Sequence, residues 1–219
     1  MWRWLTAGES HGPGLTAILE GLPAGIRVSH EELERHLARR RWCYGRGGRS
    51  KIEGDEAQIT GGVHKGITTG APVSVLIPNR DYVNWIGENR PITAPRPGHA
   101  DLPGAIKYGL KDCRIIAERA SARETAARVA LGYFARSLLR AYDIDILSWV
   151  TSIGGIHADL PPAQTRMTDQ AVAIALFQAA EASDVRCPDR ETSARMIQAI
   201  DHARENGDTL GGIFETVAL

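Results

Sequence analysis

The most regular pattern in this chain is a stripe of small and apolar side chains that recurs every three to four residues. Its members are Ala126, Ala130, Tyr133, Phe134, Leu138 and Ala141. This period matches one face of an α-helix, and Ser121 with Glu124 forms a capping box just before it. Because alanine side chains are small, we expect another element to pack closely against this helix.

The other predicted elements mix strands and helices without the regular alternation of a parallel α/β sheet. Ser29 and Glu32 form another capping box, and the helix behind it carries inward-facing Leu33 and Leu37. Further helices are predicted over residues 169–182 and 191–205, and strands over 15–19, 26–28, 57–63, 73–77, 144–156 and 212–219. Between residues 79 and 104 proline and glycine are frequent, and no regular element is predicted. This order predicts an α+β fold.

Three features bound the class of protein. No apolar run approaches the roughly 18 residues of a membrane span, and no secretory signal is apparent. The three cysteines, Cys43, Cys113 and Cys187, form no CxxC pair, which indicates neither a zinc site nor a disulfide framework. The net charge of zero argues against a general nucleic-acid binder. We therefore expect a cytoplasmic protein with no membrane, nucleic-acid or metal partner.

The basic residues are unevenly distributed. Residues 1–130 hold 15 Arg and 4 Lys against 14 acidic residues, whereas residues 131–219 hold 7 Arg against 12 acidic residues. Arginine presents a planar, permanently charged fork that suits carboxylate and phosphate groups. A codon preference for arginine would explain the excess over lysine, but not why the arginines gather in particular loops.

The segment Gly8-Glu9-Ser10-His11-Gly12 has the GxSxG pattern of the nucleophile elbow in α/β-hydrolases. That elbow needs a helix directly after the serine, whereas a strand pattern follows here, so a hydrolase is disfavoured. Ser10 and His11 between glycines could instead bind and protonate an anionic group, since glycines let backbone N–H groups approach a phosphate. A tight turn with a surface histidine is the alternative without a function.

Three more segments could contribute to an anion site. They are Arg39-Arg40-Arg41 with Arg46-Gly47-Gly48-Arg49, then Arg96-Pro97-Gly98-His99-Ala100-Asp101, and finally Glu118 to Thr125. Each also has a structural explanation: arginines at a helix C-terminus can be capping, a basic loop can be solvated, and a well-capped helix needs no ligand. Together, two histidines and many arginines favour a small polyanionic substrate. Nothing in these segments by themselves indicates a flavin.

Taken in order, these segments resemble the motifs of the chorismate synthase family. The first family signature is matched from Gly8 to Pro23, and the second from Glu118 to Val129. Further matching motifs lie at Tyr44–Arg49, Thr68–Pro72, Arg96–Asp101 and Gly207–Gly212. The resemblance covers essentially the whole chain, and the number and order of the motifs make it specific.

The resemblance implies a fold, a reaction and a cofactor. The fold would be a β-α-β sandwich, with helices held between two antiparallel sheets, assembled as a homotetramer. The reaction would be the anti-1,4-elimination of phosphate and a proton from 5-enolpyruvylshikimate-3-phosphate, which gives chorismate in the shikimate pathway of aromatic amino acid biosynthesis. It would require reduced FMN, with NADPH as a candidate reductant.

The resemblance also implies roles for individual residues. His11 would protonate the departing phosphate, and His99 would lie at the flavin. The substrate would be held by Ser10, Arg40, Arg46, Arg49, Arg96 and Arg123. The FMN site would run along Arg119, Ala120 and Ser121. We expect His11 to face the same cavity as Arg40, Arg46 and His99.

The family is considerably longer than this chain and has a third, C-terminal signature that has no counterpart here. We therefore expect one chorismate synthase-like domain over residues 1–219 that is truncated at its C-terminus and inactive by itself. The alternative is a non-catalytic fragment that binds a phosphorylated ligand, or a half-enzyme that needs a second chain.

Overall fold

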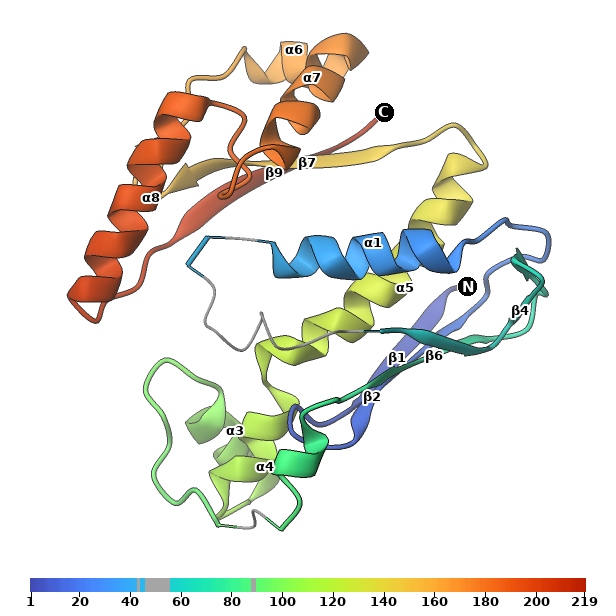
Figure 1. Ribbon diagram of the computed structural model, residues 1–219, viewed down its shortest axis with the longest axis vertical. Helices are drawn as coiled ribbons and strands as arrows, with labels where there is room; N and C mark the ends of the chain where they lie inside the picture. The colour runs from blue at the N-terminus through green and yellow to red at the C-terminus, as the bar shows by residue number, and fades with distance from the viewer. Residues whose placement is uncertain (43, 46–55, 88–89) are drawn as a thin grey trace. The chain divides into compact units, whose positions relative to one another are not determined.

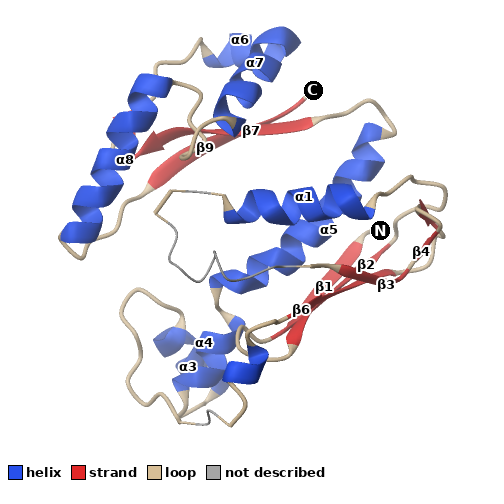
Figure 2. Ribbon diagram, viewed as in Figure 1, coloured by secondary structure: helices blue, strands red, loops and turns tan. Residues whose placement is uncertain are grey.

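The computed structural model describes residues 1–42, 44–45, 56–87 and 90–219 (Figure 1). By their contacts, the residues divide into two compact units. The first unit comprises Met1–Arg40 and Arg49–Leu138, and the second comprises Arg41–Gly48 and Leu139–Leu219. Each unit has its own antiparallel sheet accompanied by helices (Figure 2). The single domain expected from the sequence stays a prediction.

The first unit is built on a four-stranded antiparallel sheet with the order β1-β2-β6-β3. Its strands are β1 (Arg3–Gly8), β2 (Gly14–Glu20), β6 (Val73–Pro78) and β3 (Gln58–Gly61), while β4 (Val63–His64) and β5 (Ile67–Thr68) pair separately. The strands predicted over 15–19 and 73–77 are confirmed. The strand predicted over 57–63 is divided into β3 and β4 at Gly62, whose φ is +81°. The strand predicted over 26–28 is only a single bridge, because its partner β5 is two residues long.

Two helices, α1 (His30–Arg41) and α5 (Thr125–Arg140), cover one face of this sheet (Figure 1). Alternate side chains of β2 and β6 point into the core that they share, as the two-residue period of a strand requires. This core includes Leu15, Leu19, Val73, Val75, Ile77, Leu33, Leu37, Ala126, Ala130, Tyr133 and Phe134. The close packing expected from the alanines of α5 is confirmed, because Ala126 and Ala130 are fully buried.

Two details predicted for α5 are wrong. Ala141 is exposed and lies beyond the end of the helix. The predicted capping box does not form. The Ser121 side chain caps the short 3₁₀ turn η2 (Ala122–Glu124) instead, and the Glu124 carboxylate bonds to other residues. That carboxylate accepts hydrogen bonds from Thr6 Oγ1 (2.6 Å) and Arg128 Nε (2.7 Å). Glu124 therefore connects the start of α5 to β1.

The stretch without a predicted element contains short helical segments. The 3₁₀ turn η1 (Tyr82–Asn84) lies within this stretch, and helix α3 (Asp101–Tyr108) begins near its end. Helix α4 (Cys113–Arg119) comes next in the chain. Each has eight residues or fewer, which is too short for a helical period to stand out in the sequence. A Cβ on Gly104 would lie 2.4 Å from the Ile116 side chain, so glycine permits the close packing of α3 on α4.

The second unit has a three-stranded antiparallel sheet in the order β8-β7-β9. Its elements are β7 (Ile146–Ile153), β8 (Ile156–His157), α6 (Ala163–Thr168), α7 (Gln170–Glu181), α8 (Arg190–Glu205) and β9 (Gly212–Ala218). Trp149 of β7 is buried against Ala173 and Ala180 of α7. The strand predicted over 144–156 turns back at Gly154 and Gly155, which both have positive φ as in a tight hairpin. Across the described ranges, no helix combines the length and apolarity that crossing a membrane requires.

Candidate active site

Ser10 and His11 lie in the loop that joins antiparallel β1 and β2. A strand follows this loop, so Ser10 does not stand at the strand-to-helix elbow of a hydrolase, and that alternative is wrong. Gly8 has a φ of +109°, and a Cβ there would lie 2.3 Å from the Gly14 carbonyl oxygen, so the turn requires glycine. The buried side-chain amide of Asn79 donates to two carbonyl oxygens of the loop and fixes its shape.

His11 is held by the carboxylate of Glu118 near the end of α4. Its ring Nδ1 lies 2.7 Å from one carboxylate oxygen, and its backbone N–H donates to the other oxygen over 2.7 Å. The ring of Trp85 contacts the His11 ring, with centroids 3.8 Å apart, and Trp85 Nε1 donates to Asp81. The His11 side chain is 23% exposed. It is therefore fixed in place yet accessible to a ligand, which suits proton exchange.

His99 belongs to a second histidine–carboxylate pair, with Asp101 as its partner. The His99 Nδ1 lies 2.7 Å from Asp101 Oδ1. Asp101 is fully buried and accepts hydrogen bonds from Arg96 Nε (2.8 Å) and Nη2 (3.0 Å). The hydrogen bond from the Arg96 side chain, with smaller ones from the Arg96 backbone and His99, outweighs burial and holds the pKa of Asp101 well below its usual range. Asp101 therefore stays ionised and orients both His99 and Arg96.

The two pairs act on one another electrostatically. The pKa of Arg96 is raised, first by its hydrogen bond with Asp101 and further by the negative charges of Asp101 and Glu118. Glu118 thus contacts His11 directly and reaches Arg96 through space. Hydrogen bonds join His99, Arg96 and Asp101, and the negative charge of Glu118, the partner of His11, acts on Arg96; we call these five residues the charged cluster. A cavity shared by His11, Arg40, Arg46 and His99 stays a prediction.

Replacing Asp101 with asparagine should lower the free energy of unfolding by about 1–3 kcal/mol, because buried hydrogen bonds to a charged partner are lost. The depressed pKa of Asp101 in the folded state means that its stabilisation is complete above the ordinary value of 3.8 and is lost as pH falls toward the folded value. The wild type should therefore lose stability below about pH 4, and the Asn variant should lose less. Urea unfolding over that pH range measures both, and identical pH dependences would contradict the assignment.

The turn between α4 and α5 carries the residues predicted for the FMN site. The Arg119 side chain is 45% exposed and donates from Nη2 to the carbonyl oxygen (2.8 Å) and the hydroxyl (2.9 Å) of Thr6. That hydroxyl donates in turn to Glu124. Ala120 is exposed and Ser121 is partly exposed. Residues of this turn are therefore accessible, with a positioned positive charge beside them.

The residues predicted to hold substrate occupy different settings. Arg40 is partly buried near the end of α1, and its Nη1 lies 3.5 Å from a threonine hydroxyl at the start of α5. Arg123 is buried and donates to the main chain at the end of β6 over 3.2 Å, and Ser10 is buried as well. Arg46 and Arg49 lie outside the described residues. A role in substrate binding stays a prediction for each of them.

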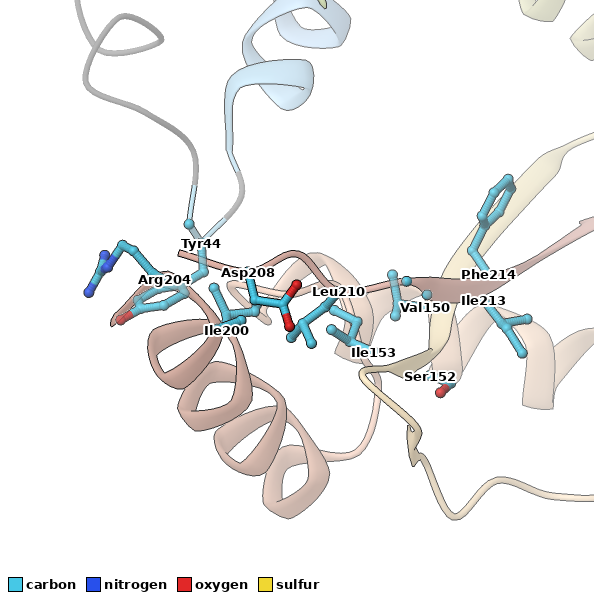
Figure 3. A pocket seen from close by; sticks show the side chains of 14 residues that line it. Tyr44, Val150, Ser152, Ile153, Ile200, Arg204, Asp208, Leu210, Ile213 and Phe214 are labelled. Atoms are coloured by element: carbon cyan, nitrogen blue, oxygen red, sulfur yellow. The ribbon is translucent and has the colours of Figure 1, made fainter. Parts of the chain in front are cut away.

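A separate pocket of about 620 Å³ lies in the second unit (Figure 3). Its wall includes Asp208, Leu210 and Tyr44, which belong to motifs that the sequence analysis matched to the family. The Tyr44 hydroxyl lies 2.8 and 2.9 Å from the two carboxylate oxygens of Asp201. Among the residues that the structure describes, the wall includes no histidine, so it offers no histidine–carboxylate pair like that of His11. The candidate active site is therefore the charged cluster of the first unit.

Three residues that shape this cluster receive no role in the sequence analysis. Glu118 stands within a matched motif, but 107 residues separate it from His11, and no local spacing could pair them. Asp101 is two residues from His99, so its partnership could have been suspected from the motif itself. Trp85 lies in the stretch where no element is predicted, and nothing in the sequence marks it.

The chain is similar to known proteins of one family. The chorismate synthase family model matches residues 2–219. The chorismate synthase of Desulforamulus reducens is 50% identical, with 98% of this chain and 56% of the relative covered. That of Geobacter sulfurreducens is 49% identical over 100% of this chain and 56% of the relative.

A structure described as the crystal structure of chorismate synthase matches the whole chain and 58% of its own length, with a TM-score of 0.83 and 41% identity. The predicted α+β fold of the chorismate synthase type is confirmed. The chain spans a little over half the length of these relatives. The match along the chain, with the ordered motifs and the fold, shows that this chain belongs to the chorismate synthase family.

Proposed function

We propose that this chain supplies part of the active site of a chorismate synthase, which eliminates phosphate from 5-enolpyruvylshikimate-3-phosphate. One observation carries the proposal: Glu118 fixes His11 in the β1–β2 loop over 2.7 Å, and the same carboxylate acts electrostatically on Arg96, which contacts His99. A leaving phosphate builds up negative charge on its bridging oxygen. A positioned acid and nearby arginines are the groups that stabilise such charge.

In this proposal, His11 gives a proton to the departing phosphate as the carbon–oxygen bond breaks. Arg96 and Arg40 would offer positive charge to the phosphate and carboxylates of the substrate, and buried Arg123 would add to it. Arg46 and Arg49 would add further contacts. Arginine suits this task because its planar fork matches the oxygens of phosphate and carboxylate.

The turn after α4 fits the cofactor that the family implies, which is FMN. Exposed Ala120 and partly exposed Ser121, with the Arg119 guanidinium beside them, can face an anionic or electron-rich group. When bound, reduced FMN would supply electron density to the elimination and take it back. His99, oriented by Asp101, would hold a proton near the flavin. We also propose a homotetramer in the cytoplasm, with NADPH as a candidate reductant, from the family resemblance alone.

The function can be tested in an extended protein, in which this chain is followed by the remaining C-terminal part of the Desulforamulus reducens relative. This protein should restore growth without aromatic amino acids to a bacterium that lacks chorismate synthase. The 219-residue chain by itself should not, because it spans 56% of that relative and should bind FMN weakly. Flavin titration of both proteins measures the second point.

A soluble extended protein that fails to restore growth would contradict the proposed function. Growth supported by the 219-residue chain itself, with tight flavin binding, would show that the remaining part of the relatives is dispensable.

A further inference from the structure

Glu118 makes three contacts with the loop that carries His11. Its backbone oxygen accepts a hydrogen bond from Ser10 N (3.1 Å), and its carboxylate accepts from the backbone N–H of His11 (2.7 Å). The other carboxylate oxygen lies 2.7 Å from His11 Nδ1. One residue of α4 therefore fixes both the main chain and the ring of His11.

The chemistry of this contact determines where the ring carries its proton. An ionised carboxylate can only accept hydrogen bonds, so the Nδ1 that lies 2.7 Å from it must be the donor. A neutral His11 is then the Nδ1–H tautomer, and proton exchange with a ligand is assigned to Nε2. When His11 is protonated, the same carboxylate stays hydrogen-bonded to Nδ1–H, so the ring need not move as Nε2 gains or loses its proton.

The surroundings keep this contact in place. The Glu118 side chain is only 11% exposed, so water competes little for its oxygens. On the other side, the Trp85 ring lies 3.8 Å from the His11 ring between centroids, and Asp81 holds Trp85 through a 2.7 Å hydrogen bond. His11 is thus confined by a carboxylate and an aromatic ring from two different segments.

The Asp101–His99 pair differs in a way that separates the two carboxylates. Asp101 divides its oxygens between His99 and the guanidinium of Arg96, which neutralises it at close range. Glu118 instead contacts Ser10 and His11, and its effect on Arg96 is through space. Glu118 is therefore the carboxylate dedicated to the loop of His11.

We propose that Glu118 is a positioning residue for His11, which fixes the Nδ1–H tautomer so that Nε2 delivers the proton to the leaving phosphate. The second half of this statement rests on the proposed function, whereas the first half concerns this chain alone. Similar carboxylate partners that orient a functional histidine typically change activity by about 10- to 100-fold when they are removed.

The tautomer can be measured directly by nitrogen NMR on this chain with ¹⁵N-labelled histidine, at a pH where the rings are neutral. The His11 signals are identified by their loss in His11→Asn. The wild type should show Nδ1 protonated and Nε2 unprotonated. In Glu118→Gln the amide can donate to Nδ1, so the Nδ1–H form should no longer dominate. Glu9→Gln, the same change at an exposed site of the same loop, should leave the His11 pattern unaltered.

A predominantly Nε2–H tautomer in the wild type would overturn the proposal. This measurement needs no variant, so it tests the proposal even if Glu118→Gln does not fold. An unchanged tautomer in a folded Glu118→Gln variant would overturn it as well. Glu118→Asp, which keeps an acceptor-only carboxylate, should retain more of the Nδ1–H form than Glu118→Gln.

In the extended protein, Glu118→Gln should lower kcat by about 10- to 100-fold with little change in KM, and Glu118→Asp should lose less. Wild-type turnover in Glu118→Gln would overturn the catalytic half of the proposal even if the tautomer shifts. If the unsubstituted extended protein shows no activity, the proposed function fails, while the tautomer measurement still decides the role of Glu118 toward His11.

Discussion

Replacing His11 with alanine in the extended protein should lower the turnover number by about 100- to 10,000-fold, the usual contribution of a positioned acid or base. An unprotonated phosphate is a poorer leaving group than a protonated one. Glu118 and Trp85 position the His11 imidazole, which would supply this proton. Alanine removes the imidazole that these two side chains hold. His99→Ala should also slow turnover, through the ring that Asp101 orients. Initial rates under anaerobic conditions measure both.

His64→Ala is the matched control for these two variants. His64 is exposed in β4 of the same unit, and it belongs to neither histidine–carboxylate pair. Its removal should leave turnover within about twofold of the wild type, since exposed substitutions away from such features are nearly neutral. If His11→Ala, with an unchanged thermal unfolding transition, turns over like His64→Ala, then His11 is not the acid.

Replacing Leu37 with alanine should lower the free energy of unfolding by about 2–5 kcal/mol. Leu37 is fully buried in α1, in the core shared with β2, β6 and α5. Deleting most of its side chain removes apolar burial and leaves a cavity among rigid neighbours. This loss is a large fraction of the 5–15 kcal/mol by which a domain is typically stable. Denaturant unfolding of the 219-residue chain gives the value.

Leu102→Ala offers the same chemical change in a helix of the same unit, at a side chain that is 54% exposed. It should cost less than about 1 kcal/mol, because little apolar surface returns to water. Similar losses in the two variants would mean that α1 does not pack on the sheet as described.

The long helices and the regularly alternating strands of this fold could be predicted from the sequence. The helices α5, α7 and α8 are 12 to 16 residues long, so their apolar period shows clearly, although the capping box predicted for α5 does not form. Likewise, the alternation in β2 and β6 marks the core face. Short helices such as α3, α4 and α6 could not be predicted, because fewer than three turns do not establish a helical period in the sequence.

The candidate active site is harder to predict from the sequence, because its contacts join segments that lie far apart in the chain. The motifs mark His11 and His99, yet the carboxylate that fixes His11 comes from α4, and the indole that covers it comes from the turn after η1. Glu124 shows the same limit, because its spacing from Ser121 predicts a local cap whereas tertiary contacts with Thr6 take its carboxylate. Local spacing predicts local hydrogen bonds, and tertiary competition decides which of them form.

The most direct test of the central claim, that this chain provides the acid for an FMN-dependent elimination, is the stoichiometry of products. The extended protein would be given 5-enolpyruvylshikimate-3-phosphate anaerobically, and phosphate and chorismate would be measured together. We expect one phosphate per chorismate with reduced FMN, and neither product with oxidised FMN or with His11→Ala at the same enzyme concentration and time. Phosphate released without chorismate, or chorismate formed at the same rate without reduced FMN, would contradict the claim.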